Sequence, residues 1–138
     1  MIKPPSQILE SALYVDDLDA AESFYGGVLG LEKVSRAGTR HVFYRCGAAV
    51  LLIFNPAETE IHYAEGQLPV PPHGARGPGH LCFRATAAEI DGWRQRLEAS
   101  CIEIESDMQW PQGGRSIYFR DPAGNSLEFT EARIWGIE

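Results

Sequence analysis

The pattern of hydrophobic and polar residues along this chain occurs twice. Residues 8–56 and residues 79–132 each begin with a strand that alternates between faces, continue into a helix and end in an aromatic hairpin. Overlaying the two copies aligns Glu10 with His80, each on the mixed face of its opening strand. The apolar face of each strand is expected to pack under the helices. Because a duplicated module folds around a shared cleft, we expect Glu10 and His80 to face that cleft.

Capping residues predict where the helices begin and end. Asp16 or Asp17 is expected to cap the first helix, and Gly30 stands where a helix ordinarily stops. The second helix opens with the capping box Thr86-Ala87-Ala88-Glu89. Residues 101–105 then alternate between polar and apolar positions, which predicts a half-exposed strand.

The two modules are joined by residues 57–78, which are rich in proline and glycine. The run from Pro69 to Pro78 predicts neither a helix nor a central strand, because proline lacks the backbone donor that both require. We expect a linker that crosses the surface, with a lid over the cleft as the alternative. His73 and Arg76 are the residues that a lid would bring to the cleft.

The composition excludes several classes of function. A net charge of −7 on 138 residues, with no run of Lys or Arg, disfavours binding to nucleic acid. The longest apolar stretch, residues 48–54, is too short to cross a membrane. Cys46, Cys82 and Cys101 have no Cys-x-x-Cys spacing, so we expect small buried thiols and no disulfide framework. The start of the chain does not resemble a secretory signal, and a cytoplasmic protein is expected.

The sharpest local motif lies near the C-terminus. The run Asp121-Pro122-Ala123-Gly124-Asn125 between two strands predicts a tight turn, because proline presets φ and glycine supplies a positive φ. The strand that follows places Ser126, Glu128 and Thr130 on its polar face.

Three passages together resemble the vicinal oxygen chelate (VOC) superfamily, which comprises the glyoxalase, bleomycin resistance protein and extradiol dioxygenase families. They are Leu13-Tyr14-Val15-Asp16-Asp17-Leu18 followed by Phe24-Tyr25-Gly26-Gly27-Val28-Leu29-Gly30-Leu31, the pair Gly79-His80, and the run from Asp121 to Glu128. The resemblance covers nearly the whole chain. It implies an α+β, glyoxalase-like fold in a single domain over residues 1–138. Two tandem βαβββ modules would form an open, cleft-containing mixed sheet.

The resemblance also implies a divalent metal ion in the cleft, held by the first and last strands of each module. Carried over position by position, the ligands are Glu10, His80 and Glu128. The fourth position falls at Leu51, which is apolar, so true glyoxalase I activity is not expected. One imidazole and two carboxylates suit Mn, Fe, Ni, Zn or Mg, with the harder ions favoured. Taken singly, these side chains could instead be a solvated residue, a hydrogen-bonded histidine or a cross-strand ion pair.

Other polar and aromatic residues are expected to line the cleft. Proton transfer would fall to Glu10, Glu128 or Tyr14. Six further side chains are candidates for binding the substrate: Phe43, Arg45, Arg84, Trp110, Arg115 and Tyr118. For Trp110, burial against the other module or a dimer partner is favoured over a stacking wall.

Two functions remain open. The first is a small metalloenzyme of lyase, isomerase, thiol transferase or dioxygenase type, which chelates vicinal oxygens of a small-molecule substrate. The second is a metal-free protein similar to the bleomycin resistance proteins, which binds and sequesters a small molecule or antibiotic. The resemblance implies a homodimer in both cases. The three ligand-capable groups favour the metalloprotein, because unpaired buried carboxylates are costly.

Overall fold

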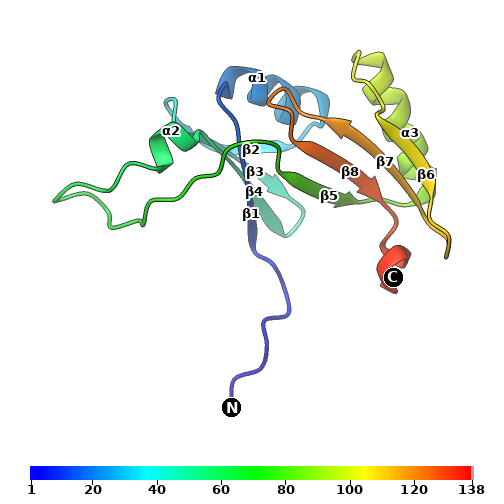
Figure 1. Cartoon of the computed structure of the whole chain (residues 1–138), viewed down its shortest axis with the longest axis horizontal. Coiled ribbons are helices and arrows are strands. Elements are labelled where there is room, and N and C mark those ends of the chain that lie inside the picture. The colour runs from blue at the N-terminus through cyan, green and yellow to red at the C-terminus, as the bar shows by residue number, and fades with distance from the viewer. Residues whose placement is uncertain (138) are drawn as a thin grey trace. The chain divides into compact units, whose positions relative to one another are not determined.

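The computed structural model describes residues 1–137 and divides into two units, with unit 1 over residues 1–76 and unit 2 from Gly77 onward. Each unit contains one four-stranded sheet (Figure 1). None of the described helices has the length and apolar character needed to cross a membrane.

Unit 1 is a mixed sheet covered by a short helical segment. Its strand order is β1-β4-β3-β2, with β1 parallel to β4 and the other pairs antiparallel. In chain order its elements are β1 (Glu10–Tyr14), α1 (Leu18–Glu22), a π-helix (Ser23–Val28), β2 (Glu32–Ala37), β3 (His41–Cys46), β4 (Ala49–Phe54) and α2 (Pro56–Thr59).

Unit 2 repeats this topology. Its strand order is β5-β8-β7-β6, again with the first strand parallel to the last. Its elements are β5 (His80–Arg84), α3 (Ala87–Ala99), β6 (Ser106–Gln109), β7 (Arg115–Arg120), β8 (Ser126–Thr130) and a 3-10 turn (Ala132–Trp135). The predicted duplication of a βαβββ module and the α+β class are therefore confirmed.

Each sheet buries one face under its helix and leaves the other face open. Leu13 on β1 and Ile53 on β4 are at most 4% exposed, whereas Glu10 and Ala12 on the other face of β1 are exposed. In unit 2, Ile117, Phe119 and Leu127 are fully buried together with Ile90 and Leu97 of α3. Burying an aliphatic side chain stabilises a fold by roughly 1.5–3 kcal/mol, so the apolar face fixes which face remains available for chemistry.

Of the predicted boundaries in unit 1, the start of the first strand was wrong and both ends of the helical segment were confirmed. The first strand begins at Glu10, and the preceding Ile8 and Leu9 are 79% and 71% exposed. Of the two expected capping residues, Asp17 is the one that caps α1, by accepting from Ala20 N at 3.0 Å. The helical segment does stop at Gly30, whose φ is +73°, but its second half is π-helical around the glycine pair at 26–27.

The strand predicted over residues 101–105 was also wrong. The chain there still follows the end of α3, with Ile102 N bonded to Leu97 O at 2.9 Å. Pairing with β7 begins at Glu105 N, which donates to Tyr118 O at 2.8 Å. Cys82 and Cys101 are exposed rather than buried, and all three cysteines are free. The predicted capping box of Thr86 and Glu89 is present at the start of α3, with bonds of 3.1 and 2.9 Å.

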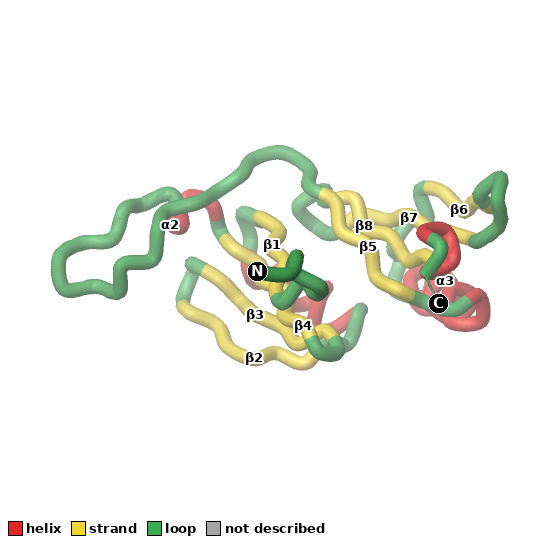
Figure 2. Tube along the Cα trace, turned by 90° about the horizontal axis from the view of Figure 1, so that it is seen from below, coloured by secondary structure: helices red, strands yellow, loops and turns green. Residues whose placement is uncertain are grey.

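A long irregular segment connects α2 to β5, drawn as a continuous loop in Figure 2. Asn55 caps α2 by accepting from Ala57 N at 3.1 Å, and proline at the first helical position suits a single turn. From Glu60 to Gly79 the chain forms no regular element. Part of this segment folds over the open face of unit 1, where it contributes to a pocket.

Candidate active site

The open face of the unit 2 sheet carries a histidine, a thiol, a carboxylate and a phenol. The strand register sets Cys82 on β5 beside Glu128 on β8, and Glu128 beside Tyr118 on β7. His80 lies two residues before Cys82 and is therefore on the same face, because side chains alternate along a strand. Its neighbour in the register is Ser126.

His80 is held in the tautomer that a metal ligand needs. Its Nδ1 lies 2.9 Å from the carbonyl oxygen of Ser126, and since a carbonyl only accepts, Nδ1 carries the hydrogen. The other ring nitrogen, Nε2, lies 3.4 Å from Oε1 of Glu128. In the neutral ring, Nε2 and the carboxylate are both acceptors, so a proton or a cation between them is needed to make the contact favourable. Metal-binding histidines commonly donate their second ring nitrogen to a carbonyl in this way.

Glu128 is a buried carboxylate without full compensation. Its side chain is 7% exposed, and its Oε2 has no hydrogen-bond partner among residues 1–137. Although part of the Cys82 residue is exposed, desolvation of its sulfur on the sheet face, the negative charge of Glu128 and a hydrogen bond to Glu128 raise the pKa of the thiol to about 12. The pKa of Tyr118 is also raised, first by burial and then by its hydrogen bond to Glu128. A buried charge is costly unless it is paired, and a cation bound by Glu128 and His80 would supply that pairing.

The turn between β7 and β8 fixes the position of His80. Asp121 accepts from the backbone N–H and from the side-chain Nδ2 of Asn125, both at 2.9 Å. Asn125 Oδ1 in turn accepts from Gly79 N at 2.7 Å, and Gly79 O accepts from Ser126 N at 2.9 Å. These bonds hold the start of β5 against the start of β8. They thereby place the imidazole of His80 beside the Ser126 carbonyl.

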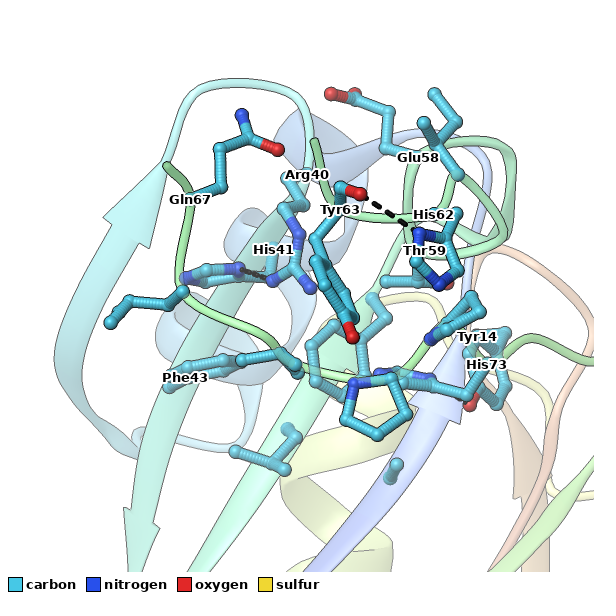
Figure 3. A pocket seen from close by; sticks show the side chains of 18 of the residues that line it. Tyr14, Arg40, His41, Phe43, Glu58, Thr59, His62, Tyr63, Gln67 and His73 are labelled. Atoms are coloured by element: carbon cyan, nitrogen blue, oxygen red, sulfur yellow. Dashed lines mark hydrogen bonds between the residues drawn. The ribbon is translucent and has the colours of Figure 1, made fainter. Parts of the chain in front are cut away.

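The open face of the unit 1 sheet lines a pocket of about 1040 Å³, seen from close by in Figure 3. Three of the predicted site residues, Glu10, Tyr14 and Phe43, lie in its lining. The irregular segment after α2 closes it from outside, and His73 of that segment is joined to the sheet by a 2.6 Å hydrogen bond between its Nδ1 and the hydroxyl of Tyr14.

Residues 7–129 match the family described as the Glyoxalase/Bleomycin resistance protein/Dioxygenase superfamily. The chain belongs to this family. The match covers both βαβββ modules and the segment between them. Among curated proteins no relative matches.

Solved structures agree with this assignment to the glyoxalase family. A crystal structure of lactoylglutathione lyase from Agrobacterium tumefaciens is 51% identical, with a TM-score of 0.93 over 98% of this chain and 100% of that one. A glyoxalase/bleomycin resistance protein/dioxygenase from Nocardioides is 24% identical, with a TM-score of 0.72 over 95% of this chain and 85% of that one. A virulence protein from Salmonella typhimurium is 24% identical, with a TM-score of 0.66 over 94% and 98%. The last two likenesses show the fold alone.

The strand registers correct one predicted position of this glyoxalase-family site. In unit 2, Glu128 stands opposite Cys82, which is two residues after His80. The same step from Glu10 in unit 1 leads to Ala12, which pairs with Leu52 and not with Leu51. Leu51 is 2% exposed on the core face, whereas Leu52 lines the pocket. The position equivalent to Glu128 is therefore Leu52, and it is apolar, as was predicted for Leu51.

Two predicted substrate-binding residues have other partners. The guanidinium of Arg115 binds Asp107 at 2.8 and 2.9 Å and also contacts Asp91 of α3. Arg115 therefore points to the helix-covered face, away from the face of Glu128. The indole of Trp110 donates to Ser116 Oγ at 2.8 Å, so it is half-buried within unit 2. The ion pairs of Arg115 occupy its guanidinium, whereas the hydrogen bond of Trp110 engages only its indole N–H.

The remaining candidates are divided between the two units. Phe43 lines the unit 1 pocket, but Arg45, two residues farther along β3, is exposed and not in its lining. Tyr118 stacks on the ring of His80 with centroids 6.4 Å apart. Arg84 lies at the end of β5 and borders a separate cavity of about 440 Å³.

The residues of unit 2 supply two of the three predicted metal ligands. His80 and Glu128 offer an oriented imidazole and an uncompensated carboxylate, which are suitable donors for a divalent ion. No group of three His, Cys, Asp or Glu side chains arranged for a metal occurs within residues 1–137. The third predicted ligand, Glu10, belongs to unit 1 and is exposed at the start of β1.

Sequence reasoning missed part of the unit 1 pocket. Arg40, His62 and Tyr63 line it and were not singled out. The sequence did contain one signal for Arg40, which together with His41 immediately precedes the aromatic positions of β3. His62 and Tyr63 lie on the irregular segment, whose path over the sheet has no periodic pattern.

Proposed function

We propose that this protein is a divalent-metal enzyme that chelates vicinal oxygens of a small-molecule substrate. The observation that carries this proposal is the pair of acceptors formed by His80 Nε2 and Glu128 Oε1, 3.4 Å apart, beside a carboxylate oxygen without a hydrogen-bond partner. A proton alone would satisfy the first contact but not Oε2. A divalent cation would satisfy both.

In this proposal Glu10 is the third metal ligand, beside His80 and Glu128. The bound ion, one of Mn, Fe, Ni, Zn or Mg, would act as a Lewis acid on the substrate oxygens. Glu128 is fixed by burial among its neighbours, whereas Glu10 is exposed at a strand end and free to reach a substrate proton. The pKa of Tyr14 is raised by burial, so its phenol stays protonated, and a substrate oxygen that displaces His73 Nδ1 would receive its hydrogen bond.

Lactoylglutathione lyase activity is a second candidate, favoured by the 51% identity to the protein of that name from Agrobacterium tumefaciens. Against it stands Leu52, which puts an apolar side chain at the position equivalent to Glu128. A carboxylate there would supply both a fourth ligand and an acid–base group. Incubating the metal-loaded protein with methylglyoxal and glutathione, and following formation of the lactoylglutathione thioester, tests this candidate directly.

The deciding experiment is elemental analysis of protein purified without chelator or affinity tag. The wild-type chain should carry a near-stoichiometric divalent metal, and the variant His80→Ala/Glu128→Ala should carry none. Glu10→Ala should reduce the metal content, while Glu65→Ala, which removes an exposed loop carboxylate, should not. If wild-type protein takes up no metal even after incubation with each ion, the enzyme proposal fails. The metal-free binding protein then becomes the better account.

We further propose a cytoplasmic homodimer. Three free thiols, two of them exposed, suit a reducing compartment. Exposed apolar side chains before β1, among them Ile8 and Leu9, offer surface that a second copy could bury. Sedimentation equilibrium would show twice the monomer mass of 15.3 kDa, and a monomer at all concentrations would contradict the proposal.

A further inference from the structure

The unit 1 pocket gathers most of the chain's imidazoles. Three of the four histidines, His41, His62 and His73, line it together with Arg40. In Figure 3 these side chains surround the pocket from the sheet and from the irregular segment. On a chain of net charge −7, this is an unusual concentration of hydrogen-bond donors.

His41 presents a donor to this pocket. Nη1 of Arg40 lies 2.7 Å from Nδ1 of His41, and because a guanidinium only donates, Nδ1 must accept. The hydrogen of the neutral ring is then on Nε2. Burial and the charge of Arg40 lower the pKa of His41, which favours this neutral form. Among residues 1–137 no ion pair involves Arg40, so its other N–H groups remain available to a ligand.

His73 is held beside the pocket by Tyr14. The hydroxyl of Tyr14 lies 2.6 Å from Nδ1 of His73, and because a phenol both donates and accepts, either ring tautomer fits this bond. An acceptor in the pocket selects the tautomer with the hydrogen on Nε2. The backbone N–H of His73 donates to Thr59 O at 2.9 Å and holds the segment in place. A ligand at this end of the pocket therefore meets donors from Arg40 and His41 and must supply acceptors. Such a ligand gains a third donor from the ring of His73.

The same donors surround an aromatic centre. The ring of Phe54 lies 4.6 Å from that of His73, 5.4 Å from Phe43 and 5.9 Å from His41. The guanidinium of Arg40 sits 5.6 Å from its centroid. His41 and Phe43 are stacked in parallel at 3.9 Å and form a flat wall. These surfaces favour a planar apolar body over a bulky saturated one.

The pocket has opposite charges at its two ends. Tyr14 and His41 both pair with Phe54 in the strand register, whereas Glu10 lies four residues earlier on β1. At a rise of about 3.3 Å per residue, roughly 13 Å separates Glu10 from the donor end, which exceeds the Debye length at physiological salt. The other carboxylate, Glu58, sits at the outer rim in Figure 3, bonded to the hydroxyl of Thr39.

We propose that this pocket binds a planar aromatic carboxylic acid, with its carboxylate at Arg40, His41 and His73. The aromatic body lies against the wall of His41 and Phe43. The far end of the ligand extends toward Glu10. That a metal chelates this end of the ligand rests on the proposed function. The substrate is thus an aromatic acid that carries its metal-binding oxygens at the end opposite its carboxylate.

Calorimetric titration with 2-naphthoate, in the presence of EDTA, tests the pocket without any metal. The cationic probe 2-naphthylmethylammonium has the same ring system and the opposite charge. We expect 2-naphthoate to bind at least about tenfold more tightly than the amine, and Arg40→Gln to weaken it roughly tenfold or more. His41→Phe keeps a ring against Phe43 but removes the donor, and should weaken 2-naphthoate several-fold while sparing the amine.

The matched control is Lys3→Gln, which makes the same charge change on the exposed N-terminal segment and should leave binding unchanged. Circular dichroism of each variant verifies its fold. Equal affinity for the two probes, no binding of either, or an equal effect of Lys3→Gln and Arg40→Gln would each overturn the inference. Because EDTA is present, failure of the metal site cannot produce these results, and elemental analysis tests the metal site separately.

Discussion

Asn125 joins the turn before β8 to the start of β5, and its truncation is expected to destabilise unit 2. The residue is 2% exposed. Asn125→Ala removes the acceptor of Gly79 N at 2.7 Å and the donor to Asp121 Oδ2 at 2.9 Å. No other side chain is replaced, so the effect comes from the contacts of this side-chain amide, these two hydrogen bonds among them, and from the space left behind.

The two lost bonds differ in cost. Gly79 is exposed, so water can replace the amide as its acceptor and the loss is about 1 kcal/mol. Asp121 is 4% exposed, and losing one hydrogen bond to a buried carboxylate costs about 1–3 kcal/mol. The free energy of unfolding should therefore fall by roughly 2–4 kcal/mol.

Tryptophan fluorescence is a suitable probe, because Trp93, Trp110 and Trp135 all lie in unit 2. With a urea m-value of about 2 kcal/mol/M, typical of a small protein, the transition midpoint should move down by roughly 1–2 M. Imidazole ¹⁵N shifts should also show His80 leaving its single Nδ1–H tautomer, because the Ser126 carbonyl is no longer held beside it.

The control for Asn125→Ala is Gln112→Ala, which removes an exposed amide in the turn between β6 and β7 of the same unit. It should change stability by less than about 0.5 kcal/mol. If the two variants unfold at the same urea concentration, or if the tautomer of His80 is unchanged in Asn125→Ala, the positioning role of this turn is wrong.

Three further predictions concern side chains outside this turn. The Cys82 thiol, with its pKa raised to about 12, should react slowly with iodoacetamide at pH 8. Glu128→Gln should speed the reaction by lowering that pKa. Equal rates for the two proteins would contradict the role assigned to the charge of Glu128. Tyr14→Phe loses the hydrogen bond that holds the irregular segment, so limited proteolysis within residues 60–76 should accelerate, as mass spectrometry of the fragments would show. The pKa of Asp107 in the folded protein is lowered by its arginine partners. The carboxylate therefore stabilises the fold above its unfolded-state pKa of about 3.9, and this stabilisation is lost as the pH falls through the lower pKa of the folded state. Asp107→Asn should therefore flatten the loss of stability below pH 4 in urea titrations, and an unchanged pH profile would refute this.

Local sequence signals were sufficient for much of the site. Strand alternation placed Glu10 and His80 on the open faces, because an apolar face must be buried and a polar face need not be. The turn motif from Asp121 to Asn125 and the capping box of Thr86 were readable for the same reason, since each depends on residues close together in the chain. The burial of Glu128 was not readable, because strand alternation alone places its side chain on the polar face.

Other features depended on pairing between distant residues. β4 is apolar at every position, so alternation could not say whether Leu51 or Leu52 faces the cleft, and only its register with β1 and β3 decided. Arg115 alternates as its strand requires, yet its partners on α3 and β6 were set by how the helix packs.

The sequence by itself determined the duplicated module, the open face of each sheet and the residue types that could bind a metal, because these follow from periodicity and short-range capping. The tertiary structure decided which of those side chains meet one another. It brought the Ser126 carbonyl 46 residues along the chain to His80, which set the ring tautomer. It also folded the irregular segment over unit 1, so that His73 met Tyr14. Such contacts between distant residues depend on strand register and loop path, which local patterns do not encode.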